Sequence, residues 1–429
     1  MSTLNRNLAP EFKTIDKIEV IRANEQKLQN GIHVYSLSAG SQEIVKLEFI
    51  FRAGMYQQPA TLIASSVNTL LETGTRSFSA NEISDGIDFY GSFLELQVDQ
   101  DFASVTLFSL NKYLEESLKF IEELIKYPTF PEDEFKIHIS NKKQKFAINS
   151  QKVNVLARRK FSELLFGETH PYGIDVKEQD FDRISTSELK DFFNRYYHPA
   201  NCTIVASGHL PANLTETLNR YFGGQEWKAG TGQTGVNRIA MVSNPVAKHF
   251  VERPDAIQSA IRVGRLLFNK THPDYCKFQV LNTILGGYFG SRLMANIRED
   301  KGYTYGIGSG LTNLVEGGYF YISTEVGADV TNQTLDEIYK ELKRLREELV
   351  DDNELETVRN YTLGHFLRSV DGPFALADKF KSIWEFGLDY SFYDHYFKSV
   401  KEVTPKDLRE LANRYLRDED LLECVVGKK

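Results

Sequence analysis

The chain repeats one sequence pattern in its two halves, and this repeat constrains the fold more than any other feature. Each half closes with an Asn-Arg-Tyr run, a short apolar segment and a glycine. Asn194 and Asn413 are 219 residues apart, and so are Gly208 and Gly427. The apolar spacing in each copy is typical of an amphipathic helix, a turn and a buried strand. We therefore expect two similar domains.

Alternation of apolar and polar residues predicts strands in both halves. In the first half it covers residues 43–51 and 93–98, and in the second half residues 256–263 and 318–323. Together with the helical segments, these strands predict an α+β fold made of two homologous domains from an internal duplication. Each domain is expected to be a mostly antiparallel sheet that helices cover on one side.

A polar, glycine-rich segment separates the two copies. Residues 230–235 are Gly-Thr-Gly-Gln-Thr-Gly, a composition typical of a linker. We therefore predict an N-terminal domain at residues 1–225, a linker at residues 226–246 and a C-terminal domain at residues 247–429.

Composition and charge exclude several classes of protein. The chain has 51 Lys and Arg against 59 Asp and Glu, a net charge of −8, which argues against a dedicated nucleic-acid binder. No apolar run approaches the roughly 18–20 residues that a membrane-spanning helix needs. The first twenty residues lack the apolar core of a secretory signal. We expect a cytoplasmic protein without a membrane span.

The nine histidines do not show the spacing of a metal site. The nearest candidate is His249 with Glu252, which leads directly into the strand predicted from residue 256. In a strand, residues three apart point to opposite faces, so these two side chains are not expected to share a metal. We predict no metal site in this chain.

The order of segments in the first half carries a family resemblance. A strand ends at Gly54, an apolar helix covers residues 62–75, a Ser-Ala-Asn-Glu-Ile turn begins at Ser79, and Pro-Thr-Phe follows at residues 128–130. This order resembles the pitrilysin/insulinase-type metallopeptidases, the inverzincins, over essentially the whole chain, including the duplication. The resemblance implies the metallopeptidase-like fold.

The zinc motif of that family is absent. By the resemblance, the five HxxEH positions fall on residues 65–69, with Ser65 and Thr69 at the two histidines and Asn68 at the glutamate. The third ligand of the family, a glutamate, would fall near Gln144. Hydroxyl groups are poor zinc ligands, and an amide cannot act as the general base. Residues 135–162 also contain eight Lys or Arg and no Asp or Glu. We expect no zinc in this chain and no zinc-dependent hydrolysis by the chain alone.

The second half keeps a segment that resembles a substrate-binding part of the family. Ser291-Arg292-Leu293 is followed by Arg298 and, seven residues later, Tyr305. The resemblance implies that Arg298 and Tyr305 reach substrate beside the zinc site of an opposing half. A guanidinium can hold a peptide carbonyl or carboxylate, and a phenol can donate to a developing oxyanion. The alternative is that Arg298 caps a helix C-terminus and Tyr305 packs in a core.

Some members of the family divide their activity between two chains, and this sequence resembles the chain without HxxEH. The leading hypothesis is a non-catalytic subunit that pairs with an HxxEH-bearing homologue, in which the zinc would lie, and helps to enclose unfolded peptide. Two alternatives stay open: a structural or scaffold homologue, and a homodimeric peptide-binding protein without catalysis.

Overall fold

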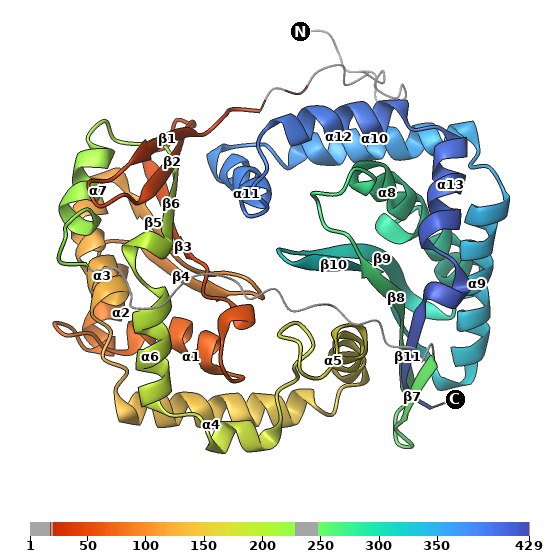
Figure 1. The fold of residues 1–429 in the computed structure, drawn as a ribbon, viewed down its shortest axis with the longest axis horizontal. Helices are drawn as coiled ribbons and strands as arrows, with labels where there is room; N and C mark the ends of the chain where they lie inside the picture. Colours follow the sequence, from red (N-terminus) through yellow and green to blue (C-terminus); the bar gives the residue numbers. More distant parts are fainter. Residues whose placement is uncertain (1–17, 19, 228–247, 429) are drawn as a thin grey trace, which may run out of the picture.

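The computed structural model describes residue 18, residues 20–227 and residues 248–428. The described residues form two β-sheets, each with helices around it (Figure 1). The first sheet has the strand order β1-β2-β6-β3-β5-β4, and the second has the order β7-β11-β8-β10-β9. The strands are β1 (Asn24–Lys27), β2 (His33–Ser38), β3 (Ile44–Phe51), β4 (Phe93–Val98), β5 (Ala103–Leu110), β6 (Cys202–Gly208), β7 (Lys248–Glu252), β8 (Gln258–Leu267), β9 (Thr304–Leu314), β10 (Gly317–Gly327) and β11 (Leu422–Gly427).

The two sheets have the same connectivity, as the repeat predicts. In the first sheet β2 runs parallel to β6, and the β6–β3, β3–β5 and β5–β4 pairs are antiparallel. In the second sheet β7 runs parallel to β11, and the β11–β8, β8–β10 and β10–β9 pairs are antiparallel. Strand β1 adds an extra antiparallel edge to the first sheet. The predicted α+β class and mostly antiparallel sheets are confirmed.

Helices and short turns connect these strands. The first half has α1 (Ile63–Leu70), α2 (Ala80–Phe89), α3 (Leu114–Lys126), α4 (Glu132–Asn149), α5 (Val153–Phe166), α6 (Thr186–Tyr196) and α7 (Leu214–Phe222). The second half has α8 (Tyr275–Asn282), two π-helical segments (Thr283–Gly287 and Met294–Asp300), α9 (Thr331–Glu347), α10 (Asp352–Arg368), α11 (Pro373–Trp384), α12 (Ser391–Glu402) and α13 (Pro405–Tyr415).

Local sequence explains where several helices begin and end. The repeated helices α6 and α13 both start with a capping box, formed by Ser185 with Glu188 and by Thr404 with Asp407. The helix predicted for residues 62–75 is shorter than expected and ends at Leu70. A 3₁₀ turn follows, and the backbone at residues 74–75 then forms β-bridges instead of continuing the helix.

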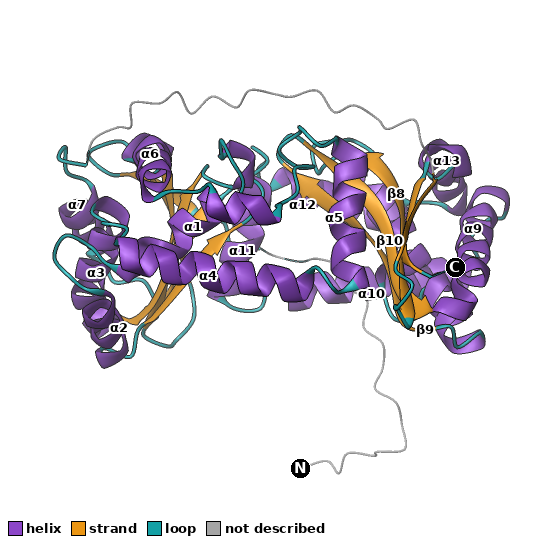
Figure 2. Cartoon of the chain, turned by 90° about the horizontal axis from the view of Figure 1, so that it is seen from below, coloured by secondary structure: helices purple, strands orange, loops and turns teal. Residues whose placement is uncertain are grey.

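The prediction that helices cover each sheet on one side is incomplete, because the two halves also exchange a helix (Figures 1 and 2). Helix α5 of the first half packs on β8 and β11 of the second sheet, and α11 of the second half packs on β2 and β6 of the first sheet. Both faces of the central strands β3 and β11 are buried, so each sheet needs cover on a second face. The opposite half supplies that cover.

The exchanged helices bury distinct apolar clusters. Ala157 and Phe161 of α5 lie with Ala260, Cys424 and Val426 of the second sheet. On the other side, a cluster of α11 and the first sheet contains Leu376, Ala377, Phe380, Leu37, Ile50 and Val205. The predicted boundaries at residues 225 and 247 stay predictions, and residues 228–247 of the linker region lie outside the described residues.

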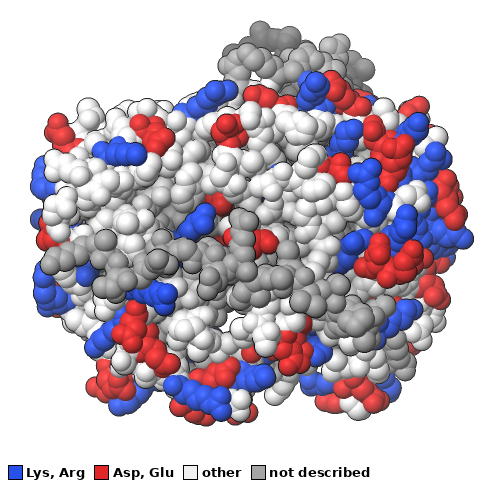
Figure 3. Space-filling view, in the orientation of Figure 1, with Lys and Arg blue, Asp and Glu red and all other residues white. Residues whose placement is uncertain are grey.

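Charged residues of both signs are interspersed on the face drawn in Figure 3, most densely on the side where α9 and α13 lie. Across the described ranges, the structure contains no helix that is both long and apolar enough to cross a membrane.

Candidate functional site

The degenerate zinc motif lies on α1, which packs against β4 and α4. Asn68, at the position of the family's general base, is 1% exposed. Its side-chain amide donates hydrogen bonds to the Ser104 carbonyl (3.1 Å) and to the Tyr197 hydroxyl (3.5 Å). Both bonds use the amide as a donor, which a carboxylate cannot be. Asn68 therefore acts as a structural amide in the core.

The two hydroxyl groups at the histidine positions bond to their own helix. Thr69 is exposed, and its hydroxyl donates to the Ser65 carbonyl (2.9 Å). The Ser65 hydroxyl donates to the Leu62 carbonyl (3.2 Å). Such bonds to the preceding turn are typical of helical serine and threonine.

A lysine from α4 reaches the motif. The Lys142 ammonium donates to the Ser65 hydroxyl (2.5 Å) and to the Ser66 hydroxyl (3.4 Å). His138, one turn earlier on α4, has its Nε2 3.2 Å from the Ser66 hydroxyl. Gln144, the predicted counterpart of the third ligand, is exposed, and Lys142 instead is the α4 residue that contacts Ser65.

Burial changes the titration of both α4 groups. It lowers the pKa of Lys142 to about 8, with the positive charge of Lys145 adding to the effect. Burial also lowers the pKa of His138 to about 4, again helped by Lys142 and Lys145. At neutral pH His138 is therefore neutral, while Lys142 is mostly charged.

These residues do not fit a zinc ion. The groups that could act as metal ligands at the motif are the hydroxyl groups of Ser65 and Thr69, which bond to backbone carbonyls, and the Asn68 amide, which is hydrogen-bonded in the core. The Lys142 ammonium lies beside them. An ammonium repels a divalent cation, and zinc in such sites needs imidazole and carboxylate ligands. Among the described residues, no group of three or more His, Cys, Asp or Glu is arranged to hold a metal.

The residues singled out in the second half come together. Arg298 lies in the last turn of the π-helical segment Met294–Asp300, and Tyr305 lies on β9. The Arg298 guanidinium lies 5.6 Å from the centre of the Tyr305 ring and 4.6 Å from the centre of the Phe289 ring. Tyr305 is 93% exposed, so it does not pack in a core. That the pair binds substrate stays a prediction.

A hollow of about 390 Å³ adjoins Tyr305, between α5 and the second sheet. Tyr305 lines it together with Arg262 of β8, Glu325 of β10 and Asn154 of α5. The Asn154 amide donates to the Glu325 carboxylate (2.9 Å), and burial lowers the pKa of Arg262. The hollow therefore combines an exposed phenol with groups that donate and accept hydrogen bonds.

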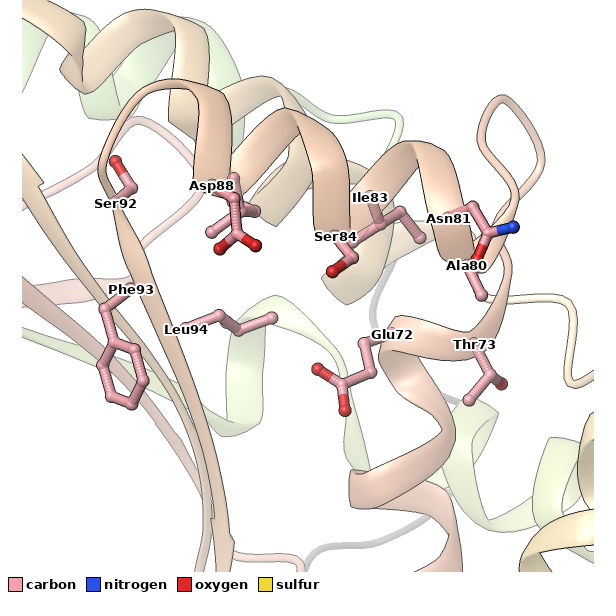
Figure 4. Close-up of a pocket in the computed structure, with 11 residues that line it drawn as sticks. Glu72, Thr73, Ala80, Asn81, Ile83, Ser84, Asp88, Ser92, Phe93 and Leu94 are labelled. Carbon is pink, nitrogen blue, oxygen red and sulfur yellow. The ribbon is translucent and has the colours of Figure 1, made fainter.

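A second hollow, of about 410 Å³, lies between α2 and β4 in the first half (Figure 4). Figure 4 shows Glu72 pointing toward Leu94 of β4, with Asp88 of α2 facing the same space. Burial raises the pKa of Glu72. Strand β4 is the outer strand of the first sheet, so this hollow lies beside a sheet edge.

Lys142 and His138 were not predicted from the sequence. Both lie in the stretch of residues 135–162, whose excess of Lys and Arg alone was noted. Their spacing of four residues, which places two side chains on one face of a helix, is the signal that was available.

Comparisons with known proteins agree with this arrangement. Residues 183–361 match the family described as "Peptidase M16 inactive domain". The chain is 21% identical over 300 residues to the "Uncharacterized zinc protease YmxG" of Bacillus subtilis, covering 70% of this chain and 72% of that protein. It is 21% identical over 367 residues to the "Non-peptidase homolog YmxG" of Helicobacter pylori, covering 84% and 83%.

The fold is shared with a solved structure. The crystal structure of a peptidase M16 inactive domain from Pseudomonas fluorescens superimposes with a TM-score of 0.85 at 22% identity, covering 95% of this chain and 98% of that one. By these matches, residues 183–361 resemble the inactive domain of peptidase M16 proteins, the pitrilysin/insulinase type, and the chain as a whole is similar to homologues of that type, one of them named a non-peptidase homolog.

Proposed function

We propose that this chain is the non-catalytic subunit of a two-chain zinc peptidase. Its partner is an HxxEH-bearing homologue that holds the zinc ion, and the two chains enclose an unfolded peptide in the cytoplasm. The observation that carries the proposal is the Arg298–Tyr305 pair, in which a cation lies over a phenol that is 93% exposed. An exposed phenol is open to contact with a peptide, which a phenol packed in a core is not.

The role of the pair follows from its chemistry. The Arg298 guanidinium offers forked donors to a peptide carbonyl, and the Tyr305 hydroxyl can donate to the oxyanion that forms on that carbonyl. The polar groups beside Tyr305, among them Arg262 and Glu325, provide partners for the rest of the peptide. The zinc motif of this chain is lost, so Arg298 and Tyr305 need a zinc site from a second chain.

The sheet edges support binding of an extended peptide. Strand β4 is the outermost strand of the first sheet and packs beside α1. An extended peptide can add to such an edge through backbone hydrogen bonds. This binding mode suits an unfolded substrate, because its hydrogen bonds are made to the peptide backbone rather than to particular side chains.

The test uses the complex with the HxxEH homologue. Tyr305→Phe removes one phenolic donor and keeps the ring that lies against Arg298. We expect kcat for a quenched fluorescent peptide to fall by about 10²–10³, with a smaller change in KM. Tyr361→Phe, at another exposed tyrosine on α10, is the matched control and should leave kcat unchanged.

Assembly is measured in parallel by size-exclusion chromatography. A Tyr305→Phe complex that forms normally and cleaves at the wild-type rate overturns the proposal and favours the scaffold alternative. A chain that dimerises with itself and binds peptide without any HxxEH partner favours the homodimeric alternative.

A further inference from the structure

The turn that leads into α1 has an unusual backbone. Leu62 precedes the helix with φ 73°, and only Leu62 and Phe130 among the described non-glycine residues have positive φ. The left-handed region is sterically unfavourable for a leucine. Residues held in such unfavourable conformations are concentrated at functional sites. The turn places Ser65 in the first turn of α1, facing α4.

Ser65 and Lys142 form a close nucleophile–amine pair. Their Oγ and Nζ atoms are 2.5 Å apart. No carboxylate within the described ranges forms an ion pair with Lys142, whereas the adjacent Lys143 pairs with Asp182 at 2.9 Å. A desolvated lysine without a counter-ion gives up its proton more readily than an exposed one. A neutral amine at this distance can accept the serine proton.

The groups around Lys142 make its ammonium easier to deprotonate than that of an exposed lysine. Helix α4 packs against α1 and the 3₁₀ segment Glu178–Asp182. From α1, Lys142 meets only the neutral hydroxyl groups of Ser65 and Ser66; on its own helix the charge of Lys145 and neutral His138 are near. The Asp182 carboxylate of the 3₁₀ segment is engaged by Lys143. Burial accordingly lowers the pKa of Lys142 to about 8.

A donor for an oxyanion is also present. The backbone N–H of Ala64 donates to the Gln58 side chain, and that of Ser66 donates to the Leu62 carbonyl. The N–H of Ser65 between them has no acceptor in the described part of the chain. The N–H of a serine nucleophile commonly contributes to an oxyanion hole, and the helix N-terminus adds a favourable dipole.

We propose that Ser65 and Lys142 form a serine–lysine pair that hydrolyses acyl esters without a metal. The neutral Lys142 amine takes the hydroxyl proton as Ser65 Oγ attacks the carbonyl carbon. The bond to the alcohol then breaks, and the Lys142 ammonium returns the proton to that alcohol. Water attacks the acyl-serine, Lys142 takes a proton from the water, and this proton passes to Ser65 Oγ as the carboxylic acid leaves.

The test is made on the full chain alone, without any partner subunit. A fluorophosphonate probe is expected to add once, at Ser65, as located by peptide mass mapping. The rate should rise with pH with a midpoint near 8, where Lys142 becomes neutral. Hydrolysis of p-nitrophenyl acetate should follow the same profile. Labelling should persist in 1,10-phenanthroline, which distinguishes it from a contaminating zinc peptidase.

Four variants separate the roles. Ser65→Ala and Lys142→Met should each reduce labelling at least tenfold. Lys142→Arg keeps the positive charge and the hydrogen-bond donor but cannot accept a proton at these pH values, so its labelling should fall as far as that of Lys142→Met. Circular dichroism should show that this variant remains folded. Lys136→Met, at an exposed lysine of the same helix that pairs with Glu132, is the matched control and should label normally.

The proposal is overturned if the folded chain is not labelled at Ser65, or if Lys142→Arg is labelled at the wild-type rate. Neither result affects the Arg298–Tyr305 proposal, because that test measures zinc-dependent cleavage in the two-chain complex.

Discussion

Lys381 and Glu48 join the two halves of the molecule across the exchanged helix. The Lys381 ammonium, on α11, donates a 2.6 Å hydrogen bond to the Glu48 carboxylate, on β3. The Glu48 side chain is 4% exposed, and Lys46 approaches it at 3.5 Å. A carboxylate buried this deeply needs its cations, so the position of α11 on the first sheet is tied to this pair.

Removing the pair should therefore weaken the fold. We expect Lys381→Met to lower the free energy of unfolding by about 1–3 kcal/mol. The Glu48 carboxylate would lose its hydrogen bond from Lys381 and would keep only the longer contact with Lys46. Urea unfolding at pH 7 measures the change. Lys343→Met, in an exposed pair with Glu347, is the control and should cost less than about 1 kcal/mol. Equal effects for the two variants would show that the Lys381–Glu48 pair does not stabilise the fold.

The purified chain should contain far less than one zinc ion at the Ser65–Thr69 segment. The hydroxyl and amide groups there are poor ligands, and Lys142 adds a positive charge. Inductively coupled plasma mass spectrometry of the purified chain measures the metal content. A full equivalent of zinc that disappears in Ser65→Ala or Thr69→Ala would contradict the prediction.

Restoring HxxEH alone should not produce an efficient enzyme. The triple variant Ser65→His, Asn68→Glu, Thr69→His lacks a third ligand and keeps the Lys142 cation. Its new glutamate would also face the Ser104 carbonyl that Asn68 now donates to, so we expect a lower melting temperature as well. Robust cleavage of a quenched fluorescent peptide by this variant would refute the expectation.

Adding a carboxylate on α4 tests which residue faces the motif. We expect Lys142→Glu, in the triple variant, to tighten zinc binding in calorimetry, because it removes the cation and adds a ligand on the side that contacts Ser65. Gln144→Glu in the same background is the matched comparison and should have a smaller effect. The opposite order would place the third ligand at Gln144, as sequence comparison alone suggests.

Glu385 should make stability depend on pH. Burial raises the pKa of this carboxyl to about 7, against the opposing effect of Lys381. The folded pKa lies above the unfolded value near 4.5, so the folded chain binds this proton more tightly than the unfolded chain does. The resulting stabilisation is fully present below pH 4.5 and is lost as the pH rises toward and through 7.

Glu385→Gln should remove this pH dependence. Above pH 7 the variant should be more stable than the wild type by about 1–3 kcal/mol, allowing for partial solvent access. Urea unfolding at pH 5 and pH 8 measures both states. Glu419→Gln, at an exposed glutamate, should leave the difference between the two pH values unchanged. If the two variants show the same difference in stability between pH 5 and pH 8, Glu385 does not cause the pH dependence.

The sequence by itself determined much of the architecture. Residues 194–208 and 413–427 repeat, and in the structure both copies form a helix followed by a strand at the same position in equivalent sheets. Residues 93–98, predicted as a strand, are β4. These features depend on local periodicity and on short motifs, which a sequence displays directly. The loss of HxxEH is likewise a property of residue identity alone.

Tertiary structure decided which residues meet. Periodicity shows that a helix has an apolar face, but it does not show which sheet that face covers, so the exchange of α5 and α11 between the halves was not predicted. For the same reason Lys142 was not matched with Ser65, 77 residues away, and the ring of Tyr305 was not known to lie under Arg298. Contacts between residues far apart in the chain depend on how whole elements pack, and only the folded molecule contains that information.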